Sequence, residues 1–171
     1  KYDYLTKAIA IKLDLNHIVP KFFYLNRMRF LYNLKSKHEF AKKLISKLEG
    51  RTLIFTGSIA QAESLCKNTY HSKTDDILLK KFLGGEIDKL ACVNAGGIGY
   101  TYTNVDNFVI TQVNSNSKGD STQKIARSLV LQEGYVANIY ILVVKNTVDE
   151  DWLSKVLKDF DTNNVEYISS K

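Results

Sequence analysis

A glycine-rich stretch at residues 93–103, with the sequence VNAGGIGYTYT, constrains the fold more than any other part of this chain. It directly follows one apolar segment and precedes a second one, Phe108–Thr111. A short helical pattern at residues 122–129, TQKIARSL, comes next and carries Gln123, Lys124 and Arg127. A strand, a loop of bare backbone amides, a second strand and a helix with Gln and Arg is an order typical of a lobe that handles phosphates.

Apolar strand patterns alternate with helical patterns over most of the chain. Such alternation predicts right-handed βαβ units and a parallel sheet, hence an α/β fold with helices on the sheet. The expected strands are residues 52–55, 89–94, 108–111 and 138–144, and residues 165–168 could add an edge strand. The expected helices start at Ser36 and stop at Gly50, or cover residues 58–66, 75–83, 121–131 and 149–160.

Capping boxes predict where three of these helices begin. They are residues 36–39 (SKHE), 58–61 (SIAQ) and 147–150 (TVDE), each with Ser or Thr at the cap. In the helix at residues 75–83 we expect Ile77, Leu78 and Phe82 to face the core.

The first 33 residues are rich in aromatic side chains but lack a clean period, so we expect an N-terminal extension or inter-lobe connection, partly helical, that packs on something. Pro20 should end an element there. Residues 34–160 would then form the main domain, and residues 161–171 a polar tail. Because the chain starts with Lys1, we expect it to be a fragment or a processed piece.

The net charge of +6 favours an anionic partner such as nucleic acid. One group of lysines is interpreted as the solvated face of a helix: Lys35, Lys37, Lys42, Lys43 and Lys47. Two cysteines, Cys66 and Cys92, fit small core residues and a reducing cytoplasm. No Cys/His spacing suggests zinc, and no apolar run reaches the ~20 residues of a membrane span.

Three polar loops leave the carboxyl ends of expected strands, where parallel sheets bind their ligands. They are residues 56–58, 94–99 and 112–120. Glycines let backbone amides approach a phosphate closely. The loop at residues 94–99 is neither a dinucleotide fingerprint with its acidic clamp nor a Walker A loop with its Lys, although a methyl-donor loop stays open.

Arginine is scarce, with only Arg27, Arg29, Arg51 and Arg127 beside 20 lysines. An arginine in so lysine-rich a chain is expected to do what lysine cannot, such as bidentate binding. Gln123 and Arg127 are four residues apart and share a helix face. An arginine placed there could stabilise charge on the γ-phosphate of a nucleotide held by a neighbouring lobe.

From residue 36 to residue 159 the chain resembles the second RecA-like lobe of superfamily 2 helicases and translocases, especially the phage and bacterial DNA-repair type. The matching segments are 51–63 (RTLIFTGSIAQAE, motif IV), 70–73 (YHSK), 82–86 (FLGGE), 94–99 with 105–106 (NAGGIG and VD, motif V), 123–129 (QKIARSL, motif VI) and 146–152 (NTVDEDW).

The resemblance implies roles for particular residues. Nucleic acid would be bound by Thr56, Gly57, Ser58, Asn94, Gly96, Gly97 and Thr101. Nucleotide would be bound by Gly99, Gln123 and Arg127, with Arg127, Gln123 and Lys124 taking part in hydrolysis. It also implies ATP with Mg²⁺ as cofactor, held mainly by a first RecA-like lobe, and single-stranded or duplex nucleic acid as partner, with DNA favoured.

Two departures from the family pattern keep other functions open. Ala126 replaces the motif VI glycine, and Val130 stands where the second motif VI arginine is expected. That arginine commonly serves as the arginine finger. A degenerate, non-catalytic module that binds nucleic acid or a partner is therefore the alternative to a working helicase lobe. A Rossmann-like methyltransferase is a third reading, weakened by the missing acidic clamp.

Overall fold

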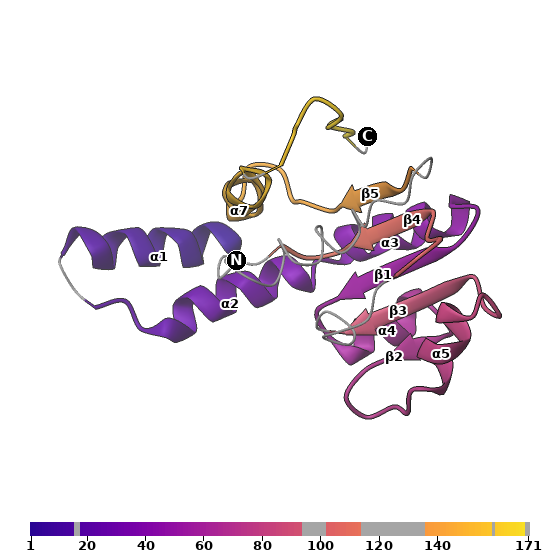
Figure 1. The fold of residues 1–171 in the computed structure, drawn as a ribbon. Coiled ribbons are helices and arrows are strands. Elements are labelled where there is room, and N and C mark those ends of the chain that lie inside the picture. Colours follow the sequence, from indigo (N-terminus) through magenta and orange to yellow (C-terminus); the bar gives the residue numbers. More distant parts are fainter. Residues whose placement is uncertain (16–17, 94–101, 114–135, 159, 170–171) are drawn as a thin grey trace.

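The computed structural model describes residues 1–15, 18–93, 102–113, 136–158 and 160–169 (Figure 1). Its strands form one five-stranded sheet in the order β2-β3-β1-β4-β5, and every neighbouring pair is parallel. They are β1 (Thr52–Thr56), β2 (Thr69–Tyr70), β3 (Lys89–Val93), β4 (Asn107–Ile110) and β5 (Asn138–Ile141). The predicted parallel α/β architecture is confirmed.

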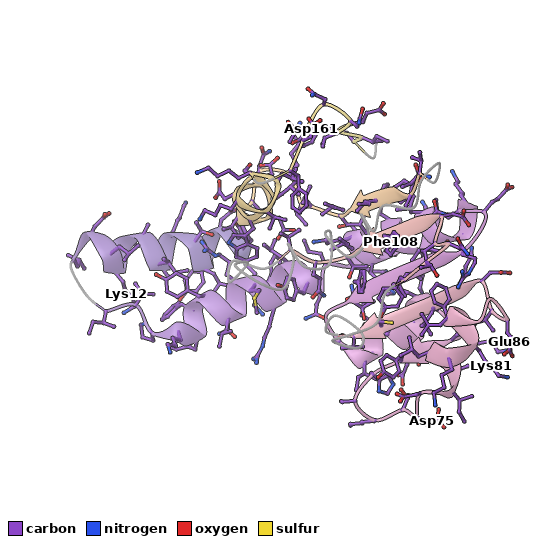
Figure 2. All side chains as sticks on the ribbon, in the orientation of Figure 1. Lys12, Asp75, Lys81, Glu86, Phe108 and Asp161 are labelled. Atoms are coloured by element: carbon purple, nitrogen blue, oxygen red, sulfur yellow. The ribbon has the colours of Figure 1, made fainter. Side chains whose placement is uncertain are left out.

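Helices cover both faces of this sheet, because successive strand residues point to opposite sides. On one face Ile54 and Val109 pack against α3 (Lys35–Lys47) and α4 (Ile59–Leu65). On the other face Leu53 and Phe108 pack with α5 (Ile77–Leu83) and α7 (Val148–Leu157). Figure 2 shows Phe108 within the sheet, away from the labelled surface residues. The core is therefore two apolar layers separated by the sheet.

The central strand β1 lies between β3 and β4, and all five of its residues are buried. Its register pairs Leu53 with Leu90 on one side and with Phe108 on the other. The chain runs from β1 towards the β2 edge, then returns to place β4 on the opposite side of β1. The strand order thus reverses beside β1, and parallel sheets bind ligands at the carboxyl end of such a point.

Two of the three predicted helix caps are confirmed. The Ser58 hydroxyl accepts a hydrogen bond from the Gln61 N–H at 3.2 Å, and the Thr147 hydroxyl accepts one from the Asp149 N–H at 3.2 Å. The prediction of a cap at Ser36 is wrong. Helix α3 already begins at Lys35 after an extended Leu34, so Ser36 lies inside the first turn, where its side chain cannot cap.

Some element ends and faces also differ from the sequence prediction. Helix α5 begins at Ile77, which is 56% exposed, so the prediction that Ile77 faces the core is wrong. Phe82 is buried and Leu78 packs against the core as predicted, and Leu79 is buried as well. Phe82 and Leu79 are the fully buried residues of the helix. These two residues are three apart and share the face towards the sheet. The strand expected at residues 138–144 ends at Ile141, and residues 165–168 form no strand.

The N-terminal extension consists of two helices, α1 (Tyr2–Asp14) and α2 (Lys21–Tyr32), that pack on each other. We call this pair the N-terminal hairpin. It projects from the side of the sheet to which the strand arrows point (Figure 1). Pro20 does not end an element but is the N-cap of α2, with φ −58°. None of the helices that the structure describes is long and apolar enough to span a membrane.

Candidate nucleic-acid interface

The loop after β1 places its three predicted site residues in different surroundings. Thr56 is buried, and its hydroxyl lies 3.2 Å from the Cys92 carbonyl and 3.4 Å from the Ser58 carbonyl. Gly57 and Ser58 are exposed. A ligand at this loop would therefore meet Gly57 and Ser58, whereas the Thr56 side chain ties β1 to the end of β3.

Gly57 cannot carry a side chain without moving its neighbour. A Cβ built on Gly57 would lie 1.6 Å from Oε1 of Gln112, the second residue after β4. The Gln112 side chain thus lies directly on the glycine, and it is 7% exposed. The sequence predicts that Gly57 lets a phosphate come close to the backbone. The structure adds a second role, because Gly57 also makes room for the Gln112 side chain.

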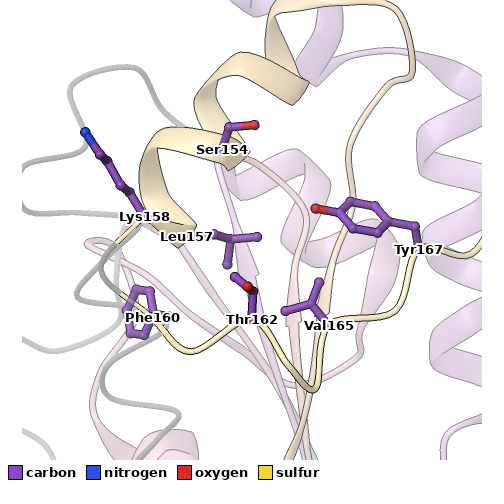
Figure 3. A pocket seen from close by; sticks show the side chains of 7 residues that line it. All are labelled: Ser154, Leu157, Lys158, Phe160, Thr162, Val165 and Tyr167. Carbon is purple, nitrogen blue, oxygen red and sulfur yellow. The ribbon is translucent and has the colours of Figure 1, made fainter.

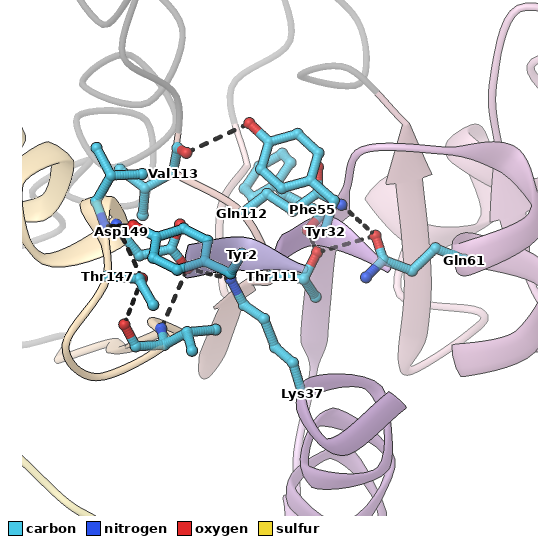
Figure 4. Close-up of polar contacts among 12 residues, drawn as sticks. Tyr2, Tyr32, Lys37, Phe55, Gln61, Thr111, Gln112, Val113, Thr147 and Asp149 are labelled. Carbon is cyan, nitrogen blue, oxygen red and sulfur yellow. Dashed lines mark hydrogen bonds and ion pairs between the residues drawn. The ribbon is translucent and has the colours of Figure 1, made fainter. Parts of the chain in front are cut away.

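Gln61 joins the loops that leave β1 and β4. Its side-chain oxygen, Oε1, accepts hydrogen bonds from Gln112 Nε2 at 2.8 Å and Thr111 Oγ1 at 3.3 Å (Figure 4). It also accepts one from Gly57 N at 3.2 Å. We call Gly57, Gln61, Thr111 and Gln112 the edge cluster. Sequence reasoning missed this arrangement, although it placed Gln61 in a capping box and Gln112 at the start of a polar loop.

A buried ion pair lies at the start of α7. Lys37 Nζ is 2.8 Å from Asp149 Oδ2, and their side chains are 5% and 0% exposed. The same oxygen accepts the Val144 N–H at 3.1 Å. Burial lowers the pKa of Lys37, and the Asp149 charge partly offsets that effect. The prediction that Lys37 belongs to a solvated lysine face is therefore wrong, because Lys37 lies on the inner side of α3 with Ala41 and Ile45.

Two tyrosines attach the N-terminal hairpin to the loops that follow the strands. The Tyr32 hydroxyl donates to the Val113 carbonyl at 3.3 Å, just after β4. The Tyr2 hydroxyl accepts the Val148 N–H at 2.8 Å, at the first residue of α7 (Figure 4). The hairpin therefore contacts the same side of the sheet as the edge cluster.

Several predicted site residues lie outside the described residues. They are Asn94, Gly96, Gly97, Gly99, Thr101, Gln123, Lys124 and Arg127, together with Val130. Of the predicted residues, the structure thus places Thr56, Gly57 and Ser58, and it brings Gly57 next to Gln112 in the loop after β4. The roles of the others stay predictions.

Arg51 bears out the expectation that a rare arginine makes contacts that lysine cannot. Its Nη1 donates to the carbonyls of Thr103 at 3.1 Å and Asn104 at 2.9 Å, and its Nη2 donates to the Phe82 carbonyl. The guanidinium also lies 4.8 Å from the Phe82 ring centroid. Because Arg51 precedes β1, it holds the amino-terminal side of the sheet and is structural.

Other candidate sites were sought among the described residues. No group of three or more His, Cys, Asp or Glu side chains there could hold a metal ion. A hollow of about 430 Å³ lies between α7 and the chain that follows, lined by Leu157, Phe160 and Tyr167 among others (Figure 3). It contains none of the predicted site residues.

Cys66 and Cys92 are both free. Burial raises the pKa of the Cys92 thiol to about 12, which fits the expected small core residue. Cys66 is only partly buried, and burial raises its pKa as well.

Comparison with solved structures identifies the fold. The chain is similar to the Sulfolobus solfataricus SWI2/SNF2 ATPase C-terminal domain, with a TM-score of 0.61 and 11% identity, over 96% of this chain and 82% of that one. It is also similar to the S. cerevisiae Dbp5 C-terminal domain bound to Gle1 and IP6, with a TM-score of 0.56 and 20% identity, over 72% and 77%.

The chain is also similar to a structure of S. cerevisiae Dbp5 bound to RNA and ADP BeF3, with a TM-score of 0.55 and 19% identity, over 76% of this chain and 37% of that one. No protein-family model matches the sequence, and no curated protein matches it. The fold is therefore a RecA-like parallel sheet flanked by helices, as in the C-terminal lobes of helicases.

Proposed function

We propose that this chain is the second lobe of an ATP-dependent nucleic-acid helicase or translocase. One observation carries the proposal. In a RecA-like sheet, the loops after the adjacent strands β1 and β4 meet at the point where strand order reverses, and Gly57 and Ser58 are exposed there. Small, exposed residues at that position let their backbone come close to the phosphates of a nucleic-acid strand.

The strand contacts would come from Gly57 and Ser58 in the described loop, with Asn94, Gly96, Gly97 and Thr101 from the next loop. Contacts of this kind go to the phosphate backbone, so we expect low sequence specificity and a steep dependence on salt. The motif resemblance favours DNA, whereas one structurally similar protein, Dbp5, is bound to RNA. Both strands therefore belong in any binding test.

Gly99, Gln123 and Arg127 would face a nucleotide shared with a first RecA-like lobe, and Lys124 would assist. The described residues contain no acidic cluster for Mg²⁺, and the sequence has no Walker A motif. ATP and Mg²⁺ would thus be held mainly by the first lobe. Closure of the two lobes on ATP and their opening after hydrolysis would move the strand.

The match to the SWI2/SNF2 ATPase C-terminal domain covers more of the chain than the match to the Dbp5 domain does. The SWI2/SNF2 match covers 96% of this chain. Because residues 34–171 make up only about four fifths of the chain, that match must include most of the N-terminal hairpin. The match to the Dbp5 domain covers 72% of the chain.

An arginine substitution tests the proposal. In the intact protein with its first lobe, Arg127→Ala should lower strand-stimulated ATP turnover about 100-fold, because a positioned cation no longer meets developing charge. Strand affinity should change little. Arg29→Ala is the matched control, an exposed arginine on α2. Equal losses of turnover and affinity would contradict the role of Arg127.

A specific feature favours one other function. Val130 stands where the family has its second motif VI arginine, so a non-catalytic binding module of the same fold is the second candidate. Strand binding without ATP turnover in the intact protein would support that module and contradict the motor.

A further inference from the structure

The edge cluster directs three hydrogen-bond donors at a single oxygen atom. Gln112 Nε2, Gly57 N and Thr111 Oγ1 lie 2.8, 3.2 and 3.3 Å from Gln61 Oε1. An amide oxygen has two lone pairs, which Gln112 Nε2 and Gly57 N–H can fill, and Thr111 Oγ1 is a third donor within reach. The Thr111 hydroxyl also lies 3.0 Å from the Phe55 carbonyl and can turn between the two acceptors. Such convergence is typical of a site for an anionic oxygen.

Two of the donors belong to buried residues, whereas the acceptor belongs to a partly buried one. Thr111 is 0% exposed and Gln112 is 7% exposed, so burial holds both residues in place after β4. Gln61 is only partly buried, and it reaches the cluster from the first turn of α4. Two of the three donors come from the loop after β4, so the arrangement is more than the start of a short helix.

The cluster is also open to a large ligand. Gly57 is exposed, and it has no side chain to keep a strand away from its N–H. The Gln112 carboxamide fills the space that a side chain on Gly57 would occupy, since a built Cβ would lie 1.6 Å from Gln112 Oε1. A phosphate that approaches Gly57 would therefore meet the Gln61 carboxamide before it meets the donors.

We propose that the Gln61 carboxamide oxygen takes the place of a phosphate oxygen, and that a nucleic-acid strand displaces it to bind Gly57 N–H, Gln112 Nε2 and Thr111 Oγ1. This inference rests on the proposed function, and it adds Thr111 and Gln112 as strand-binding residues with Gln61 as an internal competitor. A charged phosphate oxygen accepts these hydrogen bonds more strongly than an amide oxygen does. The exchange is therefore favourable once the strand is near.

Removal of the competitor should tighten strand binding. The apparent Kd equals the intrinsic Kd divided by the fraction of molecules in which the site is open. If Gln61 leaves the site open in about a tenth of molecules, Gln61→Ala should lower the Kd for a strand about tenfold. Gln61→Glu should raise the Kd at least about tenfold, because a carboxylate would hold the donors more firmly and repel phosphate.

The test uses the 171-residue chain and fluorescently labelled 12-nucleotide DNA and RNA strands, with Kd measured by anisotropy at several salt concentrations. Gln61→Ala, Gln61→Glu and the wild type are compared with Glu63→Ala, an exposed control on the same helix. Circular dichroism confirms that each variant is folded. The log–log dependence of affinity on salt should be the same in Gln61→Ala as in the wild type, because both make the same phosphate contacts in the bound state and differ only in how often the site is open.

The outcomes separate this inference from the proposed function. Tighter binding by Gln61→Ala and weaker binding by Gln61→Glu, with Glu63→Ala changed less than either, is the expected result. If the wild type binds a strand and Gln61→Ala binds equally or more weakly, the competitor role is overturned while the helicase lobe stands. If neither the wild type nor any variant binds DNA or RNA, strand contact at this edge is overturned as well.

Discussion

The central sheet and the N-terminal hairpin are held together in different ways. Every residue of β1 is buried, and the strand is flanked on both sides by β3 and β4. The hairpin buries only Leu5, Ile9 and Leu31 along two helices. It leaves other apolar side chains more than half exposed, among them Ile11, Ile18 and Phe22.

This difference predicts two levels of stability within one chain. The sheet should unfold cooperatively, since its strands share one core. The hairpin should open locally, because its attachment includes few buried apolar contacts and the two tyrosine hydrogen bonds of Tyr2 and Tyr32. The predictions below test that contrast, starting with the largest effect.

Phe108→Ala should destabilise the whole lobe by about 3–5 kcal/mol, since it removes a side chain that is 1% exposed at the centre of the core. Urea unfolding followed by circular dichroism measures the change. Ile77→Ala, at a residue that is 56% exposed, should stay within about 0.5 kcal/mol of the wild type. Similar losses in both variants would refute the assignment of the core.

Lys37→Met should cost on the order of 3 kcal/mol, because it leaves the Asp149 carboxylate buried without its cation. Adding Asp149→Asn should restore most of that loss, since an amide oxygen can still accept the Val144 N–H. Lys35→Met is the control, because Lys35 is 90% exposed in its pair with Glu39. A double variant no more stable than Lys37→Met would show that the ion pair is not the cause.

Cys92 gives the stability of the sheet a dependence on high pH. Its pKa is about 12 in the folded protein, above the ordinary value of 9.0, so the unfolded thiol loses its proton first. Stability should therefore fall as pH rises above 9, by up to about 1.4 kcal/mol per pH unit. Cys92→Ala should show a shallower decline in urea unfolding between pH 9 and 11. Identical slopes for the two proteins would rule out this linkage.

Tyr2→Phe should have the smallest effect, about 1 kcal/mol, because the Val148 N–H loses its acceptor. Hydrogen exchange followed by mass spectrometry should show faster exchange in α1 and unchanged protection in β1. Tyr4→Phe is the control, at a residue that is 71% exposed. Faster exchange throughout the sheet would mean that hairpin and sheet open together.

The sequence predicted the parts of the fold whose pattern is local. Strand β1 is a short apolar run between Arg51 and Gly57, and Ser58 caps the next helix, so both were placed correctly. The bounds of the two hairpin helices could not be predicted from the sequence, because the apolar residues of the first 33 positions do not follow one helical period. Tertiary contacts such as the Tyr2 and Tyr32 hydrogen bonds join distant parts of the chain and leave no local signal.

The candidate site was predictable only in part, for the same reason. Gly57 and Ser58 stood out as small residues after a strand. The contact between Gln61 and Gln112 links residues 51 positions apart, and the pairing of Lys37 with Asp149 links residues 112 positions apart. Lys37 looked like part of a charged face because a helical pattern of lysines does not show which one faces a distant carboxylate.

The central claim is that a nucleic-acid strand binds at the edge of the sheet beside Gly57, and chemical-shift mapping tests it most directly. An isotope-labelled sample of the chain is titrated with single-stranded DNA and with RNA, and backbone amide signals are followed. We predict salt-sensitive shifts at Gly57, Ser58 and Gln112 that are larger than any shift in residues 165–169. Shifts confined to the N-terminal hairpin, or no shift at a saturating concentration of either strand, would contradict the account.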